Sequence, residues 1–306
     1  MKRAFNAIVA AIILLSLAAP VVAGPFEDAG VAYDRGDYAT ALQILRPLAD
    51  QGIRRAQAIL GAMYADGKGV PQNYAEAVRW YRKAADQGHA GAQYNLGQLY
   101  RLGRGVPQND AEAVKWYRLA ADQADASDAQ YALGAMYYHG RGVPQDNAAA
   151  LSCYRKSADQ GYALAQYNLG IMYEEGRGVP KNYAEAMKWY RKAADQGDAL
   201  AQSTLGQLYG LGQGVPKNYA EAVKWYRLAA DQGHANAQFN LGIMYYEGQG
   251  VPQNYVSAYM WFDLAAAQGD LTAVENRNLV ERRMTKAQLI EALKLARESK
   301  PKSTPR

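Results

Sequence analysis

The chain of 306 residues contains one cysteine, Cys153, and three histidines. A single thiol cannot form a disulfide within the chain, so no such cross-link is expected to stabilise the fold. No two histidines stand at the spacing of metal ligands, and the sequence therefore predicts no metal site. For Cys153 itself two interpretations stay open: an inert thiol in a core, or a reactive or dimerising one.

Catalytic patterns are missing as well. A serine nucleophile needs a neighbouring base and an oxyanion site, but the one Ser-x-x-Lys sequence, Ser299–Lys302, stands near the C-terminus and no Lys-Thr-Gly follows it. Gly-x-Gly segments recur at regular intervals and run into Val-Pro, so turn geometry explains them better than phosphate binding does. We expect no catalytic residue and no cofactor.

Charge of either sign is sparse, with 34 basic and 29 acidic residues. The small basic excess lies at the two ends: Lys2 and Arg3 at the start, and eight basic against two acidic residues from residue 282 onward. The body between them carries 24 basic and 27 acidic residues. Because no basic stripe with interleaved aromatic residues occurs, we expect no nucleic-acid partner.

The one long apolar run lies at the N-terminus, at residues 8–17, after a short basic start. It is shorter than the roughly 20 residues that span a bilayer as a helix, and small residues precede a possible cleavage site between Ala23 and Gly24. Residues 1–23 are therefore predicted to be a signal peptide, and the mature protein to be periplasmic or secreted without stable membrane insertion. A retained N-terminal anchor is the alternative.

An internal repeat dominates the rest of the chain. The triplet Gly-Val-Pro recurs six times, with successive spacings of 36, 37, 36, 36 and 36 residues. Its glycines are Gly69, Gly105, Gly142, Gly178, Gly214 and Gly250. A fixed period of this length indicates a repeat array and not a mosaic of domains.

Each unit is predicted to form two helices. In the second unit, Leu96 and Tyr100 lie on one apolar stripe at helical spacing, and Gly103 is placed to end that helix. The next helix starts after Asn109, whose side chain can cap it, with Glu112 placed as a reciprocal cap. Because such a hairpin cannot bury both faces alone, neighbouring units must stack into an all-α solenoid.

This pattern resembles the Sel-one-like repeats (SLR), which are related to tetratricopeptide repeats. The matching features are a Leu-Gly pair, a following Tyr, the Gly-x-Gly-Val loop, a Trp-Tyr pair and a terminal Ala-Ala. They cover about residues 55–269 in six copies. The resemblance implies a right-handed α-solenoid that serves as a protein-binding scaffold, without naming the partner.

The flanking segments complete the predicted organisation. Residues 24–54 form a divergent tetratricopeptide-like unit, in which Pro47 should kink or shorten the second helix. Residues 270–298 form two C-terminal capping helices, the second starting at Thr285 with a capping box. The polar residues 299–306 are predicted to be disordered.

The regular pattern of the repeats is interrupted at one joint, near residues 124–153. Ala124 replaces the glycine that ends other units, an additional residue follows, and Cys153 stands where the other units have tryptophan. A thiol in a tryptophan-sized position leaves space or draws neighbours inward. These changes predict a change of pitch or a softer joint near residues 124–153.

The five tryptophans share one repeat position: Trp80, Trp116, Trp189, Trp225 and Trp261. They lie on the apolar stripe of the second helix, so they are predicted to pack in the core. The alternative is a stacking ladder for carbohydrate, which would suit a cell-wall or exopolysaccharide partner.

Function should lie where the repeats differ, since stacking explains the shared positions. In the tetratricopeptide relatives the first helices line the concave face, and the position before Leu-Gly carries peptide-gripping asparagines. The resemblance assigns this role to Asn95, Asn168 and Asn240 alone. With the other variable positions, the candidate peptide-binding residues are Asn95, Gln98, Arg101, Asn168, Glu175, Gln207 and Asn240.

The expected function is thus that of an exported adaptor, which binds a protein or peptide in its concave groove and assembles or regulates a cell-envelope complex. A binder of cell-wall or exopolysaccharide glycans is the second hypothesis. A hydrolase of β-lactams or peptidoglycan is the third. The sequence leaves the oligomeric state open.

Overall fold

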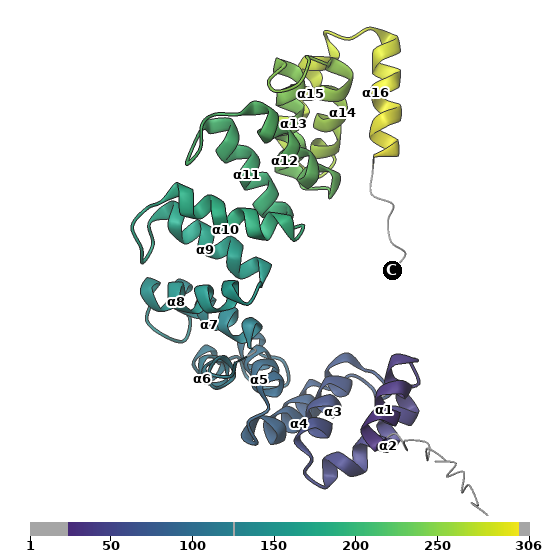
Figure 1. Ribbon diagram of the computed structural model, residues 1–306. Helices are drawn as coiled ribbons and strands as arrows, with labels where there is room; N and C mark the ends of the chain where they lie inside the picture. The colour runs from purple at the N-terminus through teal and green to yellow at the C-terminus, as the bar shows by residue number, and fades with distance from the viewer. Residues whose placement is uncertain (1–23, 125, 300–306) are drawn as a thin grey trace, which may run out of the picture.

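The computed structural model describes residues 24–124 and 126–299, which form sixteen α-helices and no strand. The helices follow one open arc with α1 and α16 at its ends (Figure 1). The predicted all-α solenoid is confirmed. The predicted signal peptide and the predicted disordered tail, except for Ser299, lie outside the described residues.

The helices fall into pairs along the chain. They are α1 (Pro25–Asp34), α2 (Tyr38–Asp50), α3 (Arg54–Asp66), α4 (Tyr74–Asp86), α5 (Ala90–Leu102), α6 (Asp110–Ala121), α7 (Ser127–His139), α8 (Asn147–Asp159), α9 (Ala163–Glu175), α10 (Tyr183–Asp195), α11 (Ala199–Leu211), α12 (Tyr219–Asp231), α13 (Ala235–Glu247), α14 (Tyr255–Ala266), α15 (Leu271–Glu281) and α16 (Lys286–Glu298). Odd-numbered helices from α3 to α13 are the first helices of the repeats, and even-numbered helices from α4 to α14 are the second.

The ends of the helices follow from the repeated glycine and asparagine. Helix α5 ends at Gly103, which is in the left-handed conformation with φ 65°, a region that glycine enters without steric cost. Helix α6 begins after Asn109, whose side chain accepts a hydrogen bond from the Glu112 N–H at 3.0 Å. The predicted reciprocal cap is wrong, because the Glu112 carboxylate pairs with Lys115 instead and the Asn109 N–H donates to the Tyr100 carbonyl.

The two helices of a repeat meet where the Leu-Gly glycine faces an aromatic ring. A Cβ atom added at Gly97 would lie 2.7 Å from Tyr117, and at Gly170 only 2.5 Å from Tyr190. These distances are shorter than van der Waals contact, so glycine is required for the helices to approach this closely. The tryptophans are 2–9% exposed, which confirms that they pack in the core.

A row of buried glutamines joins each repeat to the one before it. In the central repeats Gln166 on α9 donates through Nε2 to the Ala158 carbonyl at the end of α8, at 3.1 Å. Its Oε1 accepts from Nε2 of Gln196, at 2.7 Å. The same pairing occurs six times. The pairs are Gln57 with Gln87, Gln93 with Gln123, Gln130 with Gln160, Gln166 with Gln196, Gln202 with Gln232, and Gln238 with Gln268.

A second set of contacts links the repeats on the other side of these helices. In the central repeats Arg191 on α10 donates to the Tyr209 hydroxyl at 2.7 Å, and its guanidinium lies 4.5 Å from the centre of the Trp225 ring. Equivalent arginine–tyrosine bonds recur along the chain, between residues 18 apart in four cases and 19 apart across the irregular joint. Residues that most repeats share are thus already engaged in stacking one repeat on the next.

The terminal helices depart from the repeat in different ways. Helix α2 continues through Pro47 to Asp50, so the predicted shortening is wrong. The proline lies in the last turn, where its missing N–H costs one hydrogen bond. At the other end, α15 and α16 both pack against α14, and Thr285 caps α16 in the predicted capping box. Met260 stands where α12 has the exposed Lys224, and α16 buries it.

The irregular joint lacks a side-chain cap and a tryptophan, and one additional hydrogen bond partly offsets their absence. Ala126 precedes α7 without a side-chain cap, and Cys153 is half-buried in place of a tryptophan. However, Ser157, which is fully buried, donates to the Ser127 carbonyl at 2.8 Å. Burial raises the pKa of the Cys153 thiol, which disfavours the reactive thiolate.

We expect the joint near residues 124–153 to be the least protected internal repeat in hydrogen exchange. The smaller side chain at position 153 and the missing glycine after Gln123 should lower the free energy of local opening of this repeat. Cys153→Trp should either raise protection there by filling the space or lower it by overpacking. Protection that is uniform across the central repeats would contradict the prediction and would show that the Ser157 bond is sufficient.

Candidate binding groove

The inner side of the arc carries a series of hollows between successive odd-numbered helices. Near the middle of the arc, α5 lies on the inner side and α6 on the outer side (Figure 1). The hollows lie among α1, α3 and α5, between α3 and α5, between α5 and α7, and between α7 and α9. We call the inner face formed by α1, α3, α5, α7 and α9, together with the equivalent repeat positions of α11 and α13, the groove.

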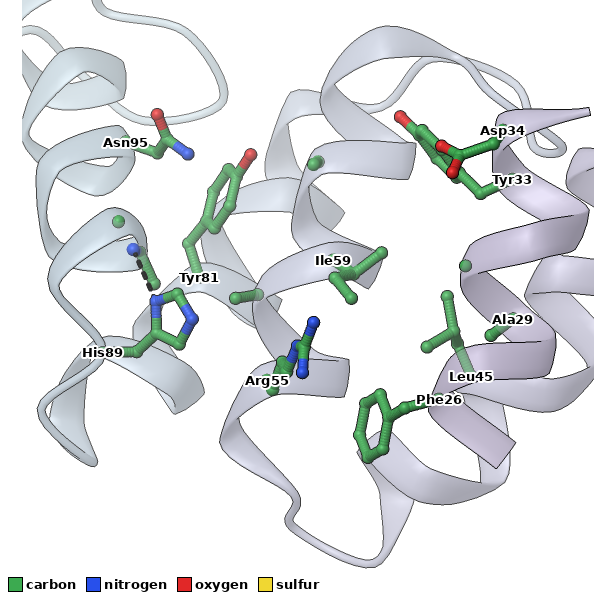
Figure 2. Close-up of a pocket in the computed structure, with 15 residues that line it drawn as sticks. Phe26, Ala29, Tyr33, Asp34, Leu45, Arg55, Ile59, Tyr81, His89 and Asn95 are labelled. Atoms are coloured by element: carbon green, nitrogen blue, oxygen red, sulfur yellow. Dashed lines mark hydrogen bonds between the residues drawn. The ribbon is translucent and has the colours of Figure 1, made fainter. Parts of the chain in front are cut away.

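The largest hollow, of about 450 Å³, opens at the N-terminal end of the groove. Figure 2 shows Phe26 and Leu45 on one side, Ile59 on α3 in the middle, and Tyr81 on the other side. His89 closes one edge and caps α5 by accepting the Ala92 N–H at 3.2 Å. Burial lowers the pKa of His89, so the neutral form that can accept this bond is favoured.

The hollow between α5 and α7, of about 330 Å³, has a different chemical character. Its polar lining comes from arginine, histidine, glutamine and tyrosine side chains, and no carboxylate lines it. The hollow between α7 and α9, of about 260 Å³, is lined mainly by tyrosine, alanine and isoleucine, with Asn168 and His139. The groove thus offers an apolar, a cationic and an aromatic compartment in order along the chain.

The three candidate asparagines lie on the first helices as predicted, but their surroundings differ. Asn95 is half-buried and lines the hollows on the α3 side of α5. Asn168 donates through Nδ2 to the hydroxyl of Tyr131 on α7, at 3.3 Å. Asn240 donates to the carbonyl of Asn236 on its own helix, at 2.8 Å. Asn168 and Asn240 therefore each use one side-chain amide hydrogen in a bond within the protein, and their side-chain oxygens remain available as acceptors.

The other candidates divide into two groups. Gln98 and Arg101 are half-buried and line the same hollow between α5 and α7. Glu175 is exposed and forms an ion pair with Arg177 at the end of α9, and Gln207 is exposed on α11. The structure therefore places Gln98 with Arg101 in the hollow between α5 and α7 and with Asn95 in the hollow between α3 and α5, and it spreads the other four candidates along the array.

Several lining residues were not among the candidates. They are Tyr94, Tyr131, Tyr162, His139 and Arg141 in the hollow between α5 and α7. A signal was present in the sequence: Ala132 and Ala135 occupy both variable positions of α7. Two alanines at groove positions predict a hollow on either side of that helix, and the side chains around it become the walls.

The described residues provide little support for a metal site, a membrane-spanning helix or a carbohydrate-binding ladder. No group of three potential metal ligands occurs among them. Their helices are also too short or too polar to be candidates for crossing a bilayer. With the tryptophans buried, the proposed carbohydrate ladder has no exposed indole rings from which to form.

Stacked helix pairs with a recessed inner face define an α-solenoid repeat scaffold. The chain belongs to the Sel1 repeat family, because the family model matches six consecutive segments that together cover most of it. The segments are residues 54–89, 90–125, 127–162, 163–198, 199–234 and 235–270. Residue 126, between the second and third segments, is the additional residue of the irregular joint.

A solved structure agrees with this assignment. A Sel1 repeat protein from Oxalobacter formigenes is 34% identical, with a TM-score of 0.70, and the match covers 78% of this chain and 94% of that one. A protective antigen of uropathogenic Escherichia coli with an SLR fold is 33% identical, with a TM-score of 0.39, over 90% of this chain and 76% of its own. No curated protein matches the chain. Proteins of this family are typically non-catalytic scaffolds that mediate protein interactions.

Proposed function

We propose that this chain is an exported scaffold that binds a protein or peptide in the groove and thereby assembles or regulates a cell-envelope complex. The proposal rests on the different places of shared and variable residues within each repeat. Shared glutamine, arginine, tyrosine and tryptophan residues are engaged between repeats, whereas residues that vary line the hollows of the groove. The apolar run at residues 8–17 supports export.

The dimensions of the groove favour an extended segment over a compact ligand. Packed helices lie about 8–10 Å apart, so alternate first helices should be roughly 20 Å apart along the groove. An extended peptide rises about 3.3 Å per residue, and one such step corresponds to roughly six residues. Asparagine and glutamine amides can bond a peptide backbone in both directions, which suits recognition that tolerates different side chains.

Site-specific photo-crosslinking in the native compartment tests the proposal. A photoreactive residue at Gln207, which is exposed on α11, should capture a defined protein partner. The same residue at Lys188, on the exposed outer face of α10, serves as the matched control. Export is tested in parallel by fusing residues 1–23 to a reporter that is active only outside the cytoplasm. Equal capture from the two positions, or a reporter retained inside, would refute the corresponding part of the proposal.

The combined change Asn95→Ala, Asn168→Ala and Asn240→Ala should weaken binding of the captured partner at least tenfold. A loss of about 1.4 kcal/mol in binding free energy produces this factor, and two or three backbone bonds can supply it. The melting temperature should fall by no more than a few degrees, because Asn240 bonds to its own helix and Asn168 makes a single bond of 3.3 Å to another helix.

The matched control for this variant is the triple change Lys115→Ala, Lys188→Ala and Lys224→Ala on the outer face. These lysines pair with glutamates on their own helices and should matter little for binding. Full binding by the asparagine variant, or a large drop in its melting temperature, would show that the asparagines have a structural role or none.

A further inference from the structure

Two hollows flank α7 and share Tyr131, Ala135 and His139 in their walls. Both exist because α7 carries Ala132 and Ala135 where α5 carries asparagine and glutamine. We call the hollow between α5 and α7 the cationic pocket, the hollow between α7 and α9 the aromatic pocket, and the two together the α7 site.

A hydrogen-bonded chain fixes one guanidinium in the cationic pocket. Arg101 donates to Gln98 Oε1 through both Nε and Nη2, at 3.1 and 2.9 Å. Gln98 in turn donates through Nε2 to the Tyr94 hydroxyl at 2.7 Å. Among the described residues Arg101 forms no ion pair with a carboxylate, and no other repeat has a Gln-x-x-Arg pair at these positions. An oriented guanidinium without an anionic partner is suited to bind a carboxylate.

A second guanidinium reaches the same pocket from the loop that follows α7. Arg141 pairs through Nε with Asp110 at 3.2 Å, and its Nη groups make no hydrogen bond within the described part of the chain. Asp110, which pairs with Arg141, and Asp128, which lies near Tyr162, do not line the pocket. These two carboxylates partly offset the two arginines. A singly charged carboxylate therefore fits the balance better than a doubly charged phosphate.

Tyrosine rings complete the walls of the cationic pocket. The Tyr131 and Tyr162 rings meet edge to face, with centres 5.2 Å apart. Burial raises the pKa of Tyr94 and raises the pKa of Tyr162 to about 12, so both phenols are neutral at physiological pH and do not repel an anion. The rings also reduce access of water to the guanidinium groups, which strengthens their interaction with an anion.

The aromatic pocket offers a different surface on the other side of α7. It contains Tyr138, Tyr154 and Ile171 in its walls, and no lysine, arginine, aspartate or glutamate. The Tyr138 ring is held by Arg177, whose guanidinium lies 5.0 Å from the ring centre. The amide oxygen of Asn168, at the same pocket, can accept a hydrogen bond from a peptide N–H.

We propose that the α7 site binds a peptide by placing a carboxylate against Arg101 and Arg141 and an apolar side chain in the aromatic pocket. The inference rests on the proposed function, since it specifies which peptides the groove selects. Helices pack about 8–10 Å apart and an extended peptide rises about 3.3 Å per residue, so the two groups should be two to three residues apart. The carboxylate can come from an acidic side chain or from a chain terminus.

Three short peptides used with the full mature chain separate these cases. The first is acetyl-Phe-Ala-Glu-amide, the second is its uncharged match acetyl-Phe-Ala-Gln-amide, and the third, acetyl-Phe-Ala-Ala with a free carboxyl end, carries the charge at the terminus. The chemical shifts of the Ala132, Ala135 and Met136 methyl groups, which line the cationic pocket, report binding. At least one charged peptide should bind about tenfold more tightly than the uncharged one, since charge-assisted bonds to arginine are lost in the latter.

Variants test whether the arginines cause this preference. Arg101→Gln should abolish the preference for the charged peptide. Arg101→Lys should retain only part of it, because the ammonium group lacks the planar fork of donors. Lys115→Gln removes a positive charge from the exposed outer face of α6 and should leave the preference unchanged. Unchanged melting curves would show that the variants fold.

Equal binding of charged and uncharged peptides, or a preference that survives Arg101→Gln, would overturn the inference. Its failure can be told apart from failure of the proposed function. If Gln207 crosslinks a partner but no charged peptide is preferred, the groove binds proteins without a carboxylate pocket. If the peptides behave as expected but no partner is captured in the groove, the scaffold role is refuted and the pocket remains.

Discussion

Replacing Gln166 by leucine should lower the free energy of unfolding of the central repeats by about 1–3 kcal/mol. Gln166 is 4% exposed and bonds both the Ala158 carbonyl and the Gln196 amide. Leucine fills a similar volume but removes both of these bonds, so the Ala158 carbonyl keeps the Gly161 N–H, at 3.0 Å, and the Gln196 amide loses its acceptor on α9. Each hydrogen bond that is lost costs about 0.5–1.5 kcal/mol.

The measurement is urea unfolding combined with hydrogen exchange, because a repeat array can open locally. Gln207→Leu is the matched control: it makes the same change on a first helix at an exposed position, and it should alter stability by less than about 0.5 kcal/mol. In a double-mutant cycle, Gln196→Ala should cost much less in the Gln166→Leu background than alone. Additive effects would show that the glutamines do not act as a pair.

The helix pairs could be predicted from the sequence because their ends are set locally. Gly103 and Asn109 act within one turn of the helices that they end and start, and a fixed period repeats that information six times. The prediction for Glu112 was wrong for the opposite reason. The side chain can reach either the Asn109 N–H or Lys115, and the outcome depends on Tyr100, whose carbonyl already holds that N–H.

The candidate site was harder to predict because it depends on contacts between repeats. Gln98 and Arg101 were identified from their variable positions, but Tyr162 and Arg141 enter the same pocket from other repeats and loops. The positions of these two side chains depend on the angle between successive repeats. The buried glutamines were missed similarly, since a shared polar residue can be a surface feature or a bond between repeats, and only the packed structure distinguishes them.

Replacing Gly170 by alanine should destabilise the protein by about 1–3 kcal/mol through overpacking. In an exposed helix the same change would stabilise by about 0.5–1 kcal/mol, so the sign of the effect is informative. The new Cβ would lie 2.5 Å from the Tyr190 ring. That ring cannot move aside easily, because it is 1% exposed and its hydroxyl donates to Glu174 at 2.5 Å.

The chain provides a matched control for this change in Gly210, which lies within α11 and would place its Cβ 3.8 Å from the nearest side chain. Gly210→Ala should therefore raise the free energy of unfolding by about 0.5–1 kcal/mol, while Gly170→Ala lowers it, in urea unfolding under the same conditions. Adding Tyr190→Leu should make the Gly170→Ala change cost less, since the smaller side chain removes the ring that the new Cβ meets. If both glycine variants were stabilised alike, close contact between the helices would not be the reason for glycine at this position.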